Sequence, residues 1–550
     1  MVRIQESIAK WSGMGRDQVF LLIVLATATH AQQLAFPTAQ GSGRFATGGR
    51  GGDVYEVTNL SNNGPGSLVD AVSVGNRTIV FRVSGTIEMG DILLRPQSHT
   101  TIAGQTAPGD GICIKGRIYI GAVSHVVIRC IRVRVDAGAA NSSGDAIDID
   151  NGRNIIIDHV SASYARDEGI SCQETSDTVT VQWCIISESL TFENHSYGSL
   201  IRGDYGDVKS YHHNLYAHDN NRLPRPGNYT ATGIDPEGLH FDFRNNVVYN
   251  WTGNEPGYNA DIHAVSRYNL IGNAYITGPE SPVRQKAFKE SCLDACGYFQ
   301  DNSYNGVVPG DPWSLVTFIG FDAAQIAAYK TRSYLVPMEP VTTTSPEQAK
   351  GAVLASAGAG IPQRDTIDRR LVHDVLSGTG HSIATTAEQP EGAWPVLHSL
   401  PAPVDDDHDG MPNDWELARN LNPDDPSDRN NIGQGGYTQL EVYLNHLTGE
   451  IVVHSDDAAV FPPGEFHLGQ NYPNPFNPVT NIEYQLPIRS HVLLKVFDVW
   501  GREVTSLVND ILEPGFKSVR WNAGDVASGV YFLQLRAGKF VGTRKMLLVR

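Results

Sequence analysis

The chain has 550 residues, of which 55 are Gly and only 19% are charged. This length and composition predict about two to four domains of loop-rich β structure, and they argue against a helical bundle or a disordered chain. The formal net charge of −18 argues against nucleic acid or an anionic membrane as partner, so a site for a polyanionic substrate would need local Arg, Lys or bound metal.

The N-terminus has the parts of a secretory signal peptide. Arg16 is followed by an apolar run at 19–26 and then by Thr29-His30-Ala31. The run is too short to span a membrane as a mature helix, and no other segment is long and apolar enough. The sequence therefore predicts a signal peptide at 1–31, an exported protein and no stable membrane span.

Six cysteines follow the predicted signal peptide, and an even number in an exported chain permits disulfides. They are Cys113, Cys130, Cys172, Cys184, Cys292 and Cys296. Their spacing is not that of a metal site. We expect structural roles for all six, either as bridges or as small buried hydrophobic side chains.

Short β-branched runs separated by Gly, Asn or Asp turns occupy residues 57–276. Their starts recur at roughly 24 to 33 residues, the range of solenoid repeats. Many runs end in Asn, which tolerates the left-handed turn needed between strands. One coil cannot bury its inward face, whereas stacked coils can. The pattern favours a solenoid over a β-sandwich, because the Asn-Gly and Asp-Gly signals of hairpins are sparse.

Residues 345–378 change to a helical pattern, with Ser345-Pro346-Glu347-Gln348 as a helix start and a second helix at 366–376. An exposed sheet edge at the end of a solenoid needs cover. We expect these helices to pack on or near that end.

A small acidic unit is predicted at 401–450, and it contains the pattern D-x-D-x-D-G-x5-E of a calcium loop. The template places ligands at Asp405, Asp407, Asp409, Met411 and Glu416. A second acidic stretch at 422–428 precedes a short helix at 436–447. The unit resembles dockerin-like or thrombospondin-type calcium repeats. Because no nucleophile or base accompanies the pattern, we expect the ion to be structural.

Residues 451–465 read as a linker, and 466–550 alternate apolar and polar residues over several strands, which predicts a small β-sandwich. The motifs at 470–478, 498–504, 529–531 and 545–550 resemble the type IX secretion sorting domain. That resemblance implies contact with secretion machinery and release to the medium or outer surface of a Gram-negative bacterium. A carbohydrate-binding sandwich is the alternative.

Three segments carry the candidate chemistry. They are GDAIDID at 144–150, NIIIDH at 154–159 followed by DEG at 167–169, and HHNLY at 212–216 followed by RLPR at 222–225. Together they resemble the family-one pectate lyases, over roughly residues 36–380. The resemblance implies an all-β catalytic domain at 32–400, a right-handed parallel β-helix that cleaves acidic galacturonan.

By position, Asp145 and Asp167 match two calcium ligands of that family, and Ca²⁺ is the implied cofactor. The family's third carboxylate falls on Ser171 here, which is a departure. Glu168 is the candidate for the missing oxygens, or the substrate supplies more of the shell. A hard cation suits such oxygen ligands and would neutralise the substrate carboxylate as a Lewis acid.

Arg222 matches the family's catalytic base, with a pure substrate clamp as the alternative role. Arg225 is the candidate for binding a sugar carboxylate. The family's substrate-binding lysine has no counterpart between Ser187 and Gly198, so His195 or Arg202 is considered in its place. Asp158 and His159 look catalytic, but the resemblance and the frequency of buried Asp–His pairs indicate a structural role in holding adjacent coils.

These patterns predict a secreted, calcium-dependent pectate lyase that gives 4,5-unsaturated oligogalacturonides by β-elimination. A pectin lyase acting on methylated substrate is the near alternative, and Asp145 and Asp167 argue against it. A β-helical polygalacturonase would need closely paired carboxylates, and no Asp-Asp pair occurs in the repeats. The non-enzymatic alternative is a polysaccharide-binding surface protein.

Overall fold

The computed structural model describes residues 32–550 except 137, 139–143, 174, 192–194, 390–391, 451–465, 470, 472–473, 487–488, 513–514, 525, 539 and 550. The predicted signal peptide and linker lie outside the described residues. The chain divides into two compact units, one ending at Val452 and the other beginning at Val453.

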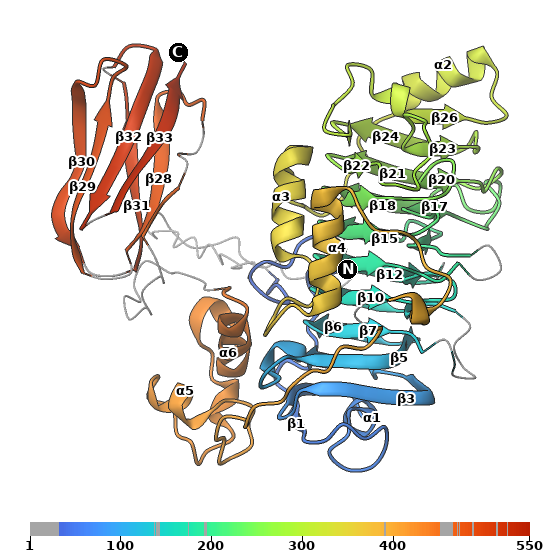
Figure 1. The fold of residues 1–550 in the computed structure, drawn as a ribbon, viewed down its shortest axis with the longest axis horizontal. Coiled ribbons are helices and arrows are strands. Elements are labelled where there is room, and N and C mark those ends of the chain that lie inside the picture. Colours follow the sequence, from blue (N-terminus) through green and yellow to red (C-terminus); the bar gives the residue numbers. More distant parts are fainter. Residues whose placement is uncertain are drawn as a thin grey trace, which may run out of the picture. The chain divides into compact units, whose positions relative to one another are not determined.

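The first unit is a stack of parallel β-coils, seen from the side in Figure 1. One face of the stack is a sheet of ten parallel strands. In spatial order they are β1 Asp53–Val57, β2 Arg77–Phe81, β4 Thr100–Ala103, β6 Ser124–Arg129, β9 Arg153–Asp158, β12 Asp177–Gln182, β15 Val208–His212, β18 Leu239–Arg244, β21 Ser266–Ile271 and β24 Cys296–Gln300.

A second sheet branches at the long strand β5 Ile112–Gly121, which also pairs with β3 Gly85–Leu94. The first part of β5 leads to β7 Arg132–Arg134, β10 Ser161–Ser163, β13 Ile185–Ser187, β16 Leu215–Ala217, β19 Val247–Tyr249, β22 Ala274–Ile276 and β25 Ser303–Tyr304. Its last part leads to β8 Ile147–Asp150, β11 Ile170–Cys172, β14 Leu200–Arg202 and β17 Arg225–Gly227.

The β8–β17 branch is continued by a short sheet, because Tyr258 N donates to Pro224 O at 3.1 Å. That sheet contains β20 Gly257–Asn259, β23 Phe288–Glu290 and β26 Val316–Phe318. The stack therefore has three faces, and the predicted parallel β-helix is confirmed.

Stacking of like residues explains the solenoid. The register pairs Val126 with Ile155 and Ile155 with Val179, and all three side chains are fully buried. Coil length varies, since Arg77 lies opposite Thr100, 23 residues on, and Lys209 opposite Phe241, 32 residues on. Insertions are absorbed by the loops while the inward apolar positions stay aligned.

An internal ladder of asparagines fixes one of the turns. The side-chain amide of Asn214 donates to Asn246 at 3.0 Å, Asn246 to Asn273 at 3.1 Å, and Asn273 to Asn302 at 2.8 Å. The prediction that asparagine adopts the left-handed turn is confirmed at Asn245 and Asn250, with φ of 50° at each, but it fails at the ladder asparagines. Positive φ occurs at the preceding residue, for example 56° at His213, while the ladder asparagines satisfy buried main-chain groups.

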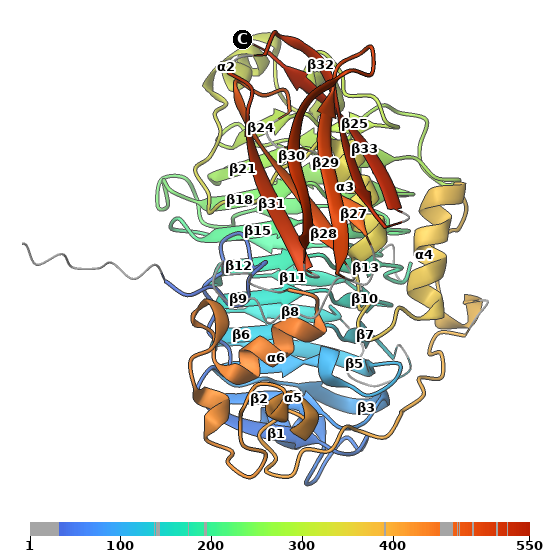
Figure 2. The same ribbon diagram turned by 90° about the vertical axis from the view of Figure 1, so that its left-hand side faces the viewer.

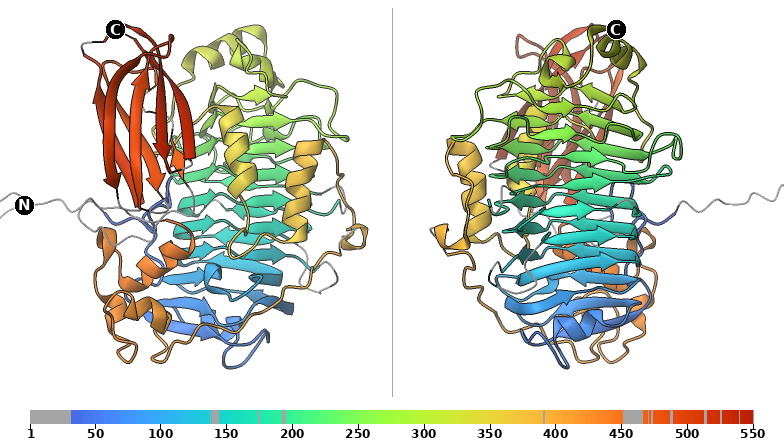
Figure 3. Two further views of the ribbon diagram at one scale, coloured as in Figure 1. Left: turned by 60° about the vertical axis from the view of Figure 1, so that its left-hand side comes forward. Right: turned by 90° about the vertical axis from the view of Figure 1, so that its right-hand side faces the viewer.

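Helices cover the stack at its ends and along one side. Figure 1 shows α1 Leu68–Val72 at the first coils and α2 Ala323–Arg332 at the last. Figure 3 shows α3 Pro346–Ser356 and α4 Thr366–Ser377 running along the side of the stack. The prediction that the helices at 345–378 cover the end is therefore wrong. Buried ion pairs explain where α4 lies, because Arg134 binds Asp365 at 2.6 Å and Asp368 at 3.1 Å.

The acidic unit belongs to the same compact body as the solenoid and lies against its first coils (Figure 2). Its helices are α5 Asn413–Leu417 and α6 Gln439–Leu447. It also has short 3₁₀ turns at Asp428–Asn430 and Gln434–Gly436, and the rest of the first unit has them at Gly104–Thr106, Pro312–Leu315 and Thr386–Glu388. We call residues 403–450 the acidic module below.

The second unit is a β-sandwich of two antiparallel sheets, as the alternating pattern predicts. Its strands are β27 His467–Leu468, β28 Val479–Leu486, β29 Ser490–Phe497, β30 Glu503–Leu512, β31 Gly515–Asn522, β32 Gly529–Ala537 and β33 Phe540–Leu548. Leu494, Val496, Leu533 and Leu535 are fully buried in its core.

All six cysteines are buried and unpaired, so they act as the small hydrophobic side chains that were one of the two expectations. Among the described residues, the structure has no helix with the length and apolar character needed to cross a membrane.

Candidate active site

The candidate site forms where one turn recurs in successive coils. Asp145 precedes β8, Glu168 precedes β11, Tyr197 precedes β14, and Arg222 precedes β17. Parallel bridges join Glu168 to Tyr197, and Tyr197 to Asn221. Because neighbouring coils are only one strand spacing apart, residues distant in the sequence meet here.

Three carboxylates converge at this turn. Asp145, Asp167 and Glu168 each place an oxygen within 4.8 Å of the others. Glu168 N donates to Asp145 Oδ1 at 3.1 Å, and the Ser171 hydroxyl donates to Asp145 Oδ2. Burial, reinforced by the nearby Asp167, raises the pKa of Asp145 to about 7. The structure thus brings Asp145, Asp167 and Glu168 together, with Ser171 positioned to hold Asp145.

Arg222 lies directly against these carboxylates. Its Nη1 contacts Glu168 Oε1 and lies 3.8 Å from Asp167 Oδ1. The guanidinium carbon lies 3.8 Å from the ring centre of Tyr197, which sequence reasoning did not identify. The backbone of Arg222 is left-handed, with φ of 59°. Glu168 and Tyr197 thus hold the guanidinium from two sides.

Arg225 and Arg202 share one carboxylate that the sequence gave no reason to single out. Arg225 Nη2 lies 3.3 Å from Asp261 Oδ1, and Arg202 Nη1 lies 3.2 Å from Asp261 Oδ2. The side chain of Arg225 is 14% exposed, whereas that of Arg202 is fully buried beneath Tyr229. Arg225 therefore reaches the surface, while Arg202 anchors the carboxylate that orients it.

His195 lies at the acidic end of the site. Its Nδ1 is 3.2 Å from Asp167 Oδ1, and its side chain is 40% exposed. Arg117 on β5, which sequence reasoning missed, donates from Nε to the main-chain oxygen of Asp145 at 2.6 Å. Of these two groups, Arg117 places a positive charge beside Asp145.

At one register position on the outer face of the β8–β17 branch and of the short sheet that continues it, the side chains change from acidic to basic along the stack. In order of strands, the residues at this position are Asp148, Ser171, Leu200, Arg225, Tyr258 and Lys289. Burial and the neighbouring Asp145 raise the pKa of Asp148 to about 6. At the other end, the ring centre of Tyr258 lies 5.3 Å from the Arg225 guanidinium and 4.8 Å from Lys289 Nζ.

Asp158 and His159 are structural, as expected. Asp158 is fully buried and accepts hydrogen bonds from Arg129 and Gln182 in the two adjacent coils, each at 2.8 Å. His159 Nδ1 lies 3.0 Å from the same carboxylate. Although burial opposes it, the positive charges of His159 and Arg129 lower the pKa of Asp158.

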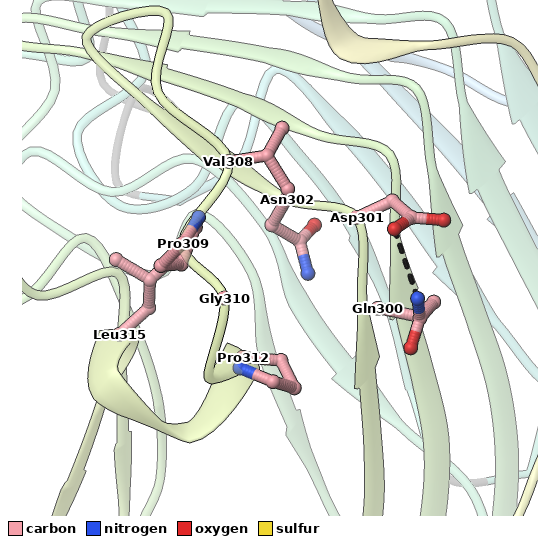
Figure 4. A pocket seen from close by; sticks show the side chains of 8 residues that line it. All are labelled: Gln300, Asp301, Asn302, Val308, Pro309, Gly310, Pro312 and Leu315. Atoms are coloured by element: carbon pink, nitrogen blue, oxygen red, sulfur yellow. Dashed lines mark hydrogen bonds between the residues drawn. The ribbon is translucent and has the colours of Figure 1, made fainter.

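A pocket near the last coils does not belong to this site (Figure 4). It is lined by Gln300, Asp301, Asn302, Val308, Pro309, Gly310, Pro312 and Leu315. Its polar side chains are already engaged, as Gln300 donates to Asp301 at 2.8 Å and Asn302 belongs to the asparagine ladder. Nothing in its lining offers a cation to an acidic substrate.

The acidic module holds a second group of carboxylates. Asp405, Asp407 and Asp409 place oxygens within 4.8 Å of one another, and so do Asp409, Glu416 and Asp428. Burial and mutual repulsion raise the pKa of Asp409 to about 7 and that of Glu416 to about 8. Met411 is buried beside them, and its N–H donates to Asp409 Oδ1 at 2.8 Å. Asp428, from the second acidic stretch, is an addition to the predicted loop.

Comparison with known proteins gives matches in both compact units of the chain. Residues 18–230 match the family model described as "Pectate lyase", and residues 470–549 match "Secretion system C-terminal sorting domain". The chain is 36% identical to a protein of Emericella nidulans named "Probable pectate lyase C", over 78% of this chain and 96% of that protein. It is 37% identical to a protein of the same name from Aspergillus fumigatus, over 78% and 97%.

Among solved structures, the chain resembles that of jun a 1, the major allergen from cedar pollen. The TM-score is 0.41 and the identity 18%, over 58% of this chain and 92% of that one.

Proposed function

Because the chain belongs to the pectate lyase family, and is therefore a polysaccharide lyase, we propose that it cleaves unmethylated (1→4)-α-D-galacturonan by calcium-dependent β-elimination, with Arg222 as the base. The products would be 4,5-unsaturated oligogalacturonides. The observation that carries the proposal is the meeting of three carboxylates with Arg222 at one recurring turn.

Asp145, Asp167 and Glu168 fit a calcium ion by their donor chemistry, since all offer carboxylate oxygens from three positions on adjacent coils. When bound, calcium would neutralise the substrate carboxylate and stabilise the negative charge that develops as the neighbouring C5 proton leaves. The hydroxyl of Ser171 and the N–H of Glu168 hold Asp145 in place for this role.

Arg222 can accept a proton only after its guanidinium has lost one, and the contact with Glu168 opposes that loss. We therefore expect Glu168 to leave Arg222 and serve as a metal ligand during turnover. The proton then moves from C5 of the sugar to Arg222, and the electron pair of the C5–H bond forms the double bond between C4 and C5. The bond from C4 to the bridging oxygen breaks, and that oxygen takes a proton from water. Tyr197 beneath the guanidinium restricts its position.

The basic end of the outer face suits a chain of carboxylates. Arg225 is held by Asp261 and stacks near Tyr258, and Lys289 lies on the same ring one strand further on. A uronate chain lying across the strands would meet cations at successive sugars. This direction places the metal-binding sugar near Asp145 and the flanking sugars toward Lys289. The methylated substrate of a pectin lyase would lose these ionic contacts.

The sorting-domain match indicates that the protein is secreted or surface-associated. We further propose that the protein is located on the outer surface of a Gram-negative bacterium or in its medium. Residues 470–549 would serve the secretion machinery rather than the substrate.

The test is to incubate the purified protein with polygalacturonate, with and without chelator, and to follow the ultraviolet absorbance of unsaturated ends. We expect absorbance that grows with time and stops when chelator is added. Reducing ends without absorbance would identify a hydrolase. Equal rates on methylated pectin in chelator would identify a pectin lyase.

A further inference from the structure

The carboxylates of the acidic module are held in a common manner. Asp407, Asp409 and Asp428 each use one oxygen to accept a main-chain N–H. Asp407 Oδ1 accepts Asp409 N at 3.2 Å, Asp409 Oδ1 accepts Met411 N at 2.8 Å, and Asp428 Oδ2 accepts Asn422 N at 2.8 Å. The second oxygens, Asp407 Oδ2, Asp409 Oδ2 and Asp428 Oδ1, are buried and have no hydrogen-bond partner among the described residues.

Glu416 is the strongest indication of a ligand. Its side chain is fully buried, and neither Oε1 nor Oε2 has a hydrogen-bond partner within the described part of the chain. Asp409, which shares the cluster with Glu416 and Asp428, is also fully buried. Buried carboxylates without a counter-charge are strongly destabilising, so these unmatched oxygens point to a cation.

We propose that Asp405, Asp407, Asp409, Glu416 and Asp428 bind one calcium ion, and that this ion fastens the acidic module to the first coils of the β-helix. Neither oxygen of Glu416 is engaged by the described residues, so both can bind the ion as a bidentate ligand. Bidentate binding gives the high coordination number that suits Ca²⁺ better than Mg²⁺. Asp428 adds a charge from beyond the loop and ties the two acidic stretches to one centre. The proposal is independent of the lyase chemistry.

The loop lies directly on the first two strands. Gly410 has φ of +90°, and a Cβ built on it would lie 3.2 Å from Val54 of β1 and 3.4 Å from Val80 of β2. Arg82, which follows β2, lies 3.1 Å from Glu56 and 3.6 Å from Asp405. Anything that orders the loop therefore orders the contact with β1 and β2.

An apolar cluster continues this contact. Met411 and Trp415 pack with Leu440 and with Ala103 of the solenoid, and Val54 packs against them. In the sequence, Met411 and Trp415 lie between Asp409 and Glu416. An ion bound by these two carboxylates would therefore also fix the positions of Met411 and Trp415. Without the ion, repulsion among the carboxylates would push the loop off this surface.

The other end of the module is attached by bonds that need no ion. Glu441 on α6 binds Arg50 at 2.7 Å, and Glu450 binds Arg129 at 2.6 Å. Removing calcium should thus loosen β1 and β2 while the contacts at Arg50 and Arg129 remain. The expected effect is local to the first coils.

The first test is calcium binding to the full chain by competition with a chromophoric chelator. Glu416→Gln and Asp428→Asn should each weaken the tightest site about tenfold or more, since both remove a ligand charge. Asp414→Asn is the matched control, because Asp414 lies on the same short helix but is exposed. Wild-type affinity in D428N would overturn the assignment of Asp428, and wild-type affinity in E416Q would overturn the site.

The second test is hydrogen exchange of the wild-type protein in calcium and in chelator, which needs no variant to fold. We expect exchange to rise at least about tenfold in β1 and β2 when calcium is removed, and to stay unchanged in β21 and β24. Unchanged protection of β1 and β2 would refute the fastening role even where calcium binds.

Discussion

In the cluster beside Arg222, each carboxylate already touches a group of the chain that offsets its charge. Asp145 accepts the Ser171 hydroxyl, Asp167 faces His195, and Glu168 contacts Arg222. In the acidic module, Glu416 meets no such group among the described residues, and several oxygens beside it are equally unmatched. In both clusters carboxylates from separate segments converge, but among the described residues Glu416 is the member with neither oxygen hydrogen-bonded.

If both clusters bind calcium as proposed, the difference predicts two affinities. Beside Arg222, the arginine competes with the ion for Glu168, so binding would be weak and would gain from the oxygens of the substrate. At Glu416, where the described residues offer no hydrogen-bond partner, the ion would bind without substrate. We therefore expect a lower calcium affinity at the site needed for turnover and a higher affinity at the site needed for stability.

The largest expected effect is the loss of turnover in Arg222→Ala. Removing a general base should lower kcat by about a thousandfold. Because Arg222 is only 16% exposed and neutralises the buried Glu168, the melting temperature of the variant is measured as well, to show that it is folded at the assay temperature. The measurement is the absorbance of unsaturated ends, with the exposed Arg153→Ala as control. Retention of even a tenth of the rate would reduce Arg222 to a substrate clamp.

A smaller effect is expected for Asp145→Asn, which removes one ligand charge from the weaker cluster. The calcium concentration that gives half-maximal activity should rise about tenfold or more, while calcium should still raise the melting temperature as in the wild type. Activity and melting are followed in the same calcium series. If the variant loses its stabilisation by calcium, the two clusters are not separate in function.

Lys289→Ala tests whether the basic end of the outer face binds the substrate. Lys289 lies on the ring of Tyr258, beyond Arg225, and far along the stack from the carboxylates. We expect KM for polygalacturonate to rise a few-fold to about tenfold with kcat nearly unchanged, because one ionic contact is lost in both ground and transition states. Lys350→Ala, on α3, is the control. A fall in kcat alone would place Lys289 in the chemistry instead.

The last prediction concerns stability rather than turnover, at Glu290, a fully buried carboxyl whose partners are hydroxyls rather than a cation. Tyr329 donates to it at 2.6 Å, and Tyr268 donates to the same oxygen. Burial raises the pKa of Glu290 from 4.5 to about 7. The folded-state pKa is above the unfolded value, so its contribution is fully present below pH 4.5 and is lost as the pH rises through about 7.

Glu290→Gln should remove that loss, which amounts to no more than about 3 kcal/mol of the free energy of unfolding. The check is urea denaturation at pH 5 and pH 8, with the exposed Glu347→Gln as reference. The same decline in wild type and E290Q would show that Glu290 does not ionise in this range.

Much of the fold could be predicted because its signals are local. Short β-branched runs that recur between turns at solenoid spacing predict the coils, and motif positions identify Asp145, Asp167 and Arg222 as a candidate group. The solenoid fold explains why these three side chains lie close together, because the same turn recurs at the same place in successive coils. The spacing of the calcium loop likewise predicts four carboxylates of the acidic module.

The rest depends on contacts that no local pattern encodes. Tyr197 lies beneath Arg222, and Asp261 holds Arg225, only because their coils are neighbours in space. Asp428 lies twelve residues after Glu416, outside the loop template, and the fold of the module brings its carboxylate next to those of Asp409 and Glu416. The position of α4 follows from its buried ion pairs with Arg134 of β7, and no local sequence pattern pairs these residues.

The most direct test is to titrate free calcium over the wild-type protein and follow the melting temperature and the formation of unsaturated ends in parallel. We expect stabilisation to be complete at calcium concentrations where cleavage of polygalacturonate is still rising, by a gap of about tenfold or more. Superimposed curves, or cleavage that proceeds in chelator, would contradict the division of the two clusters into a structural and a catalytic calcium site.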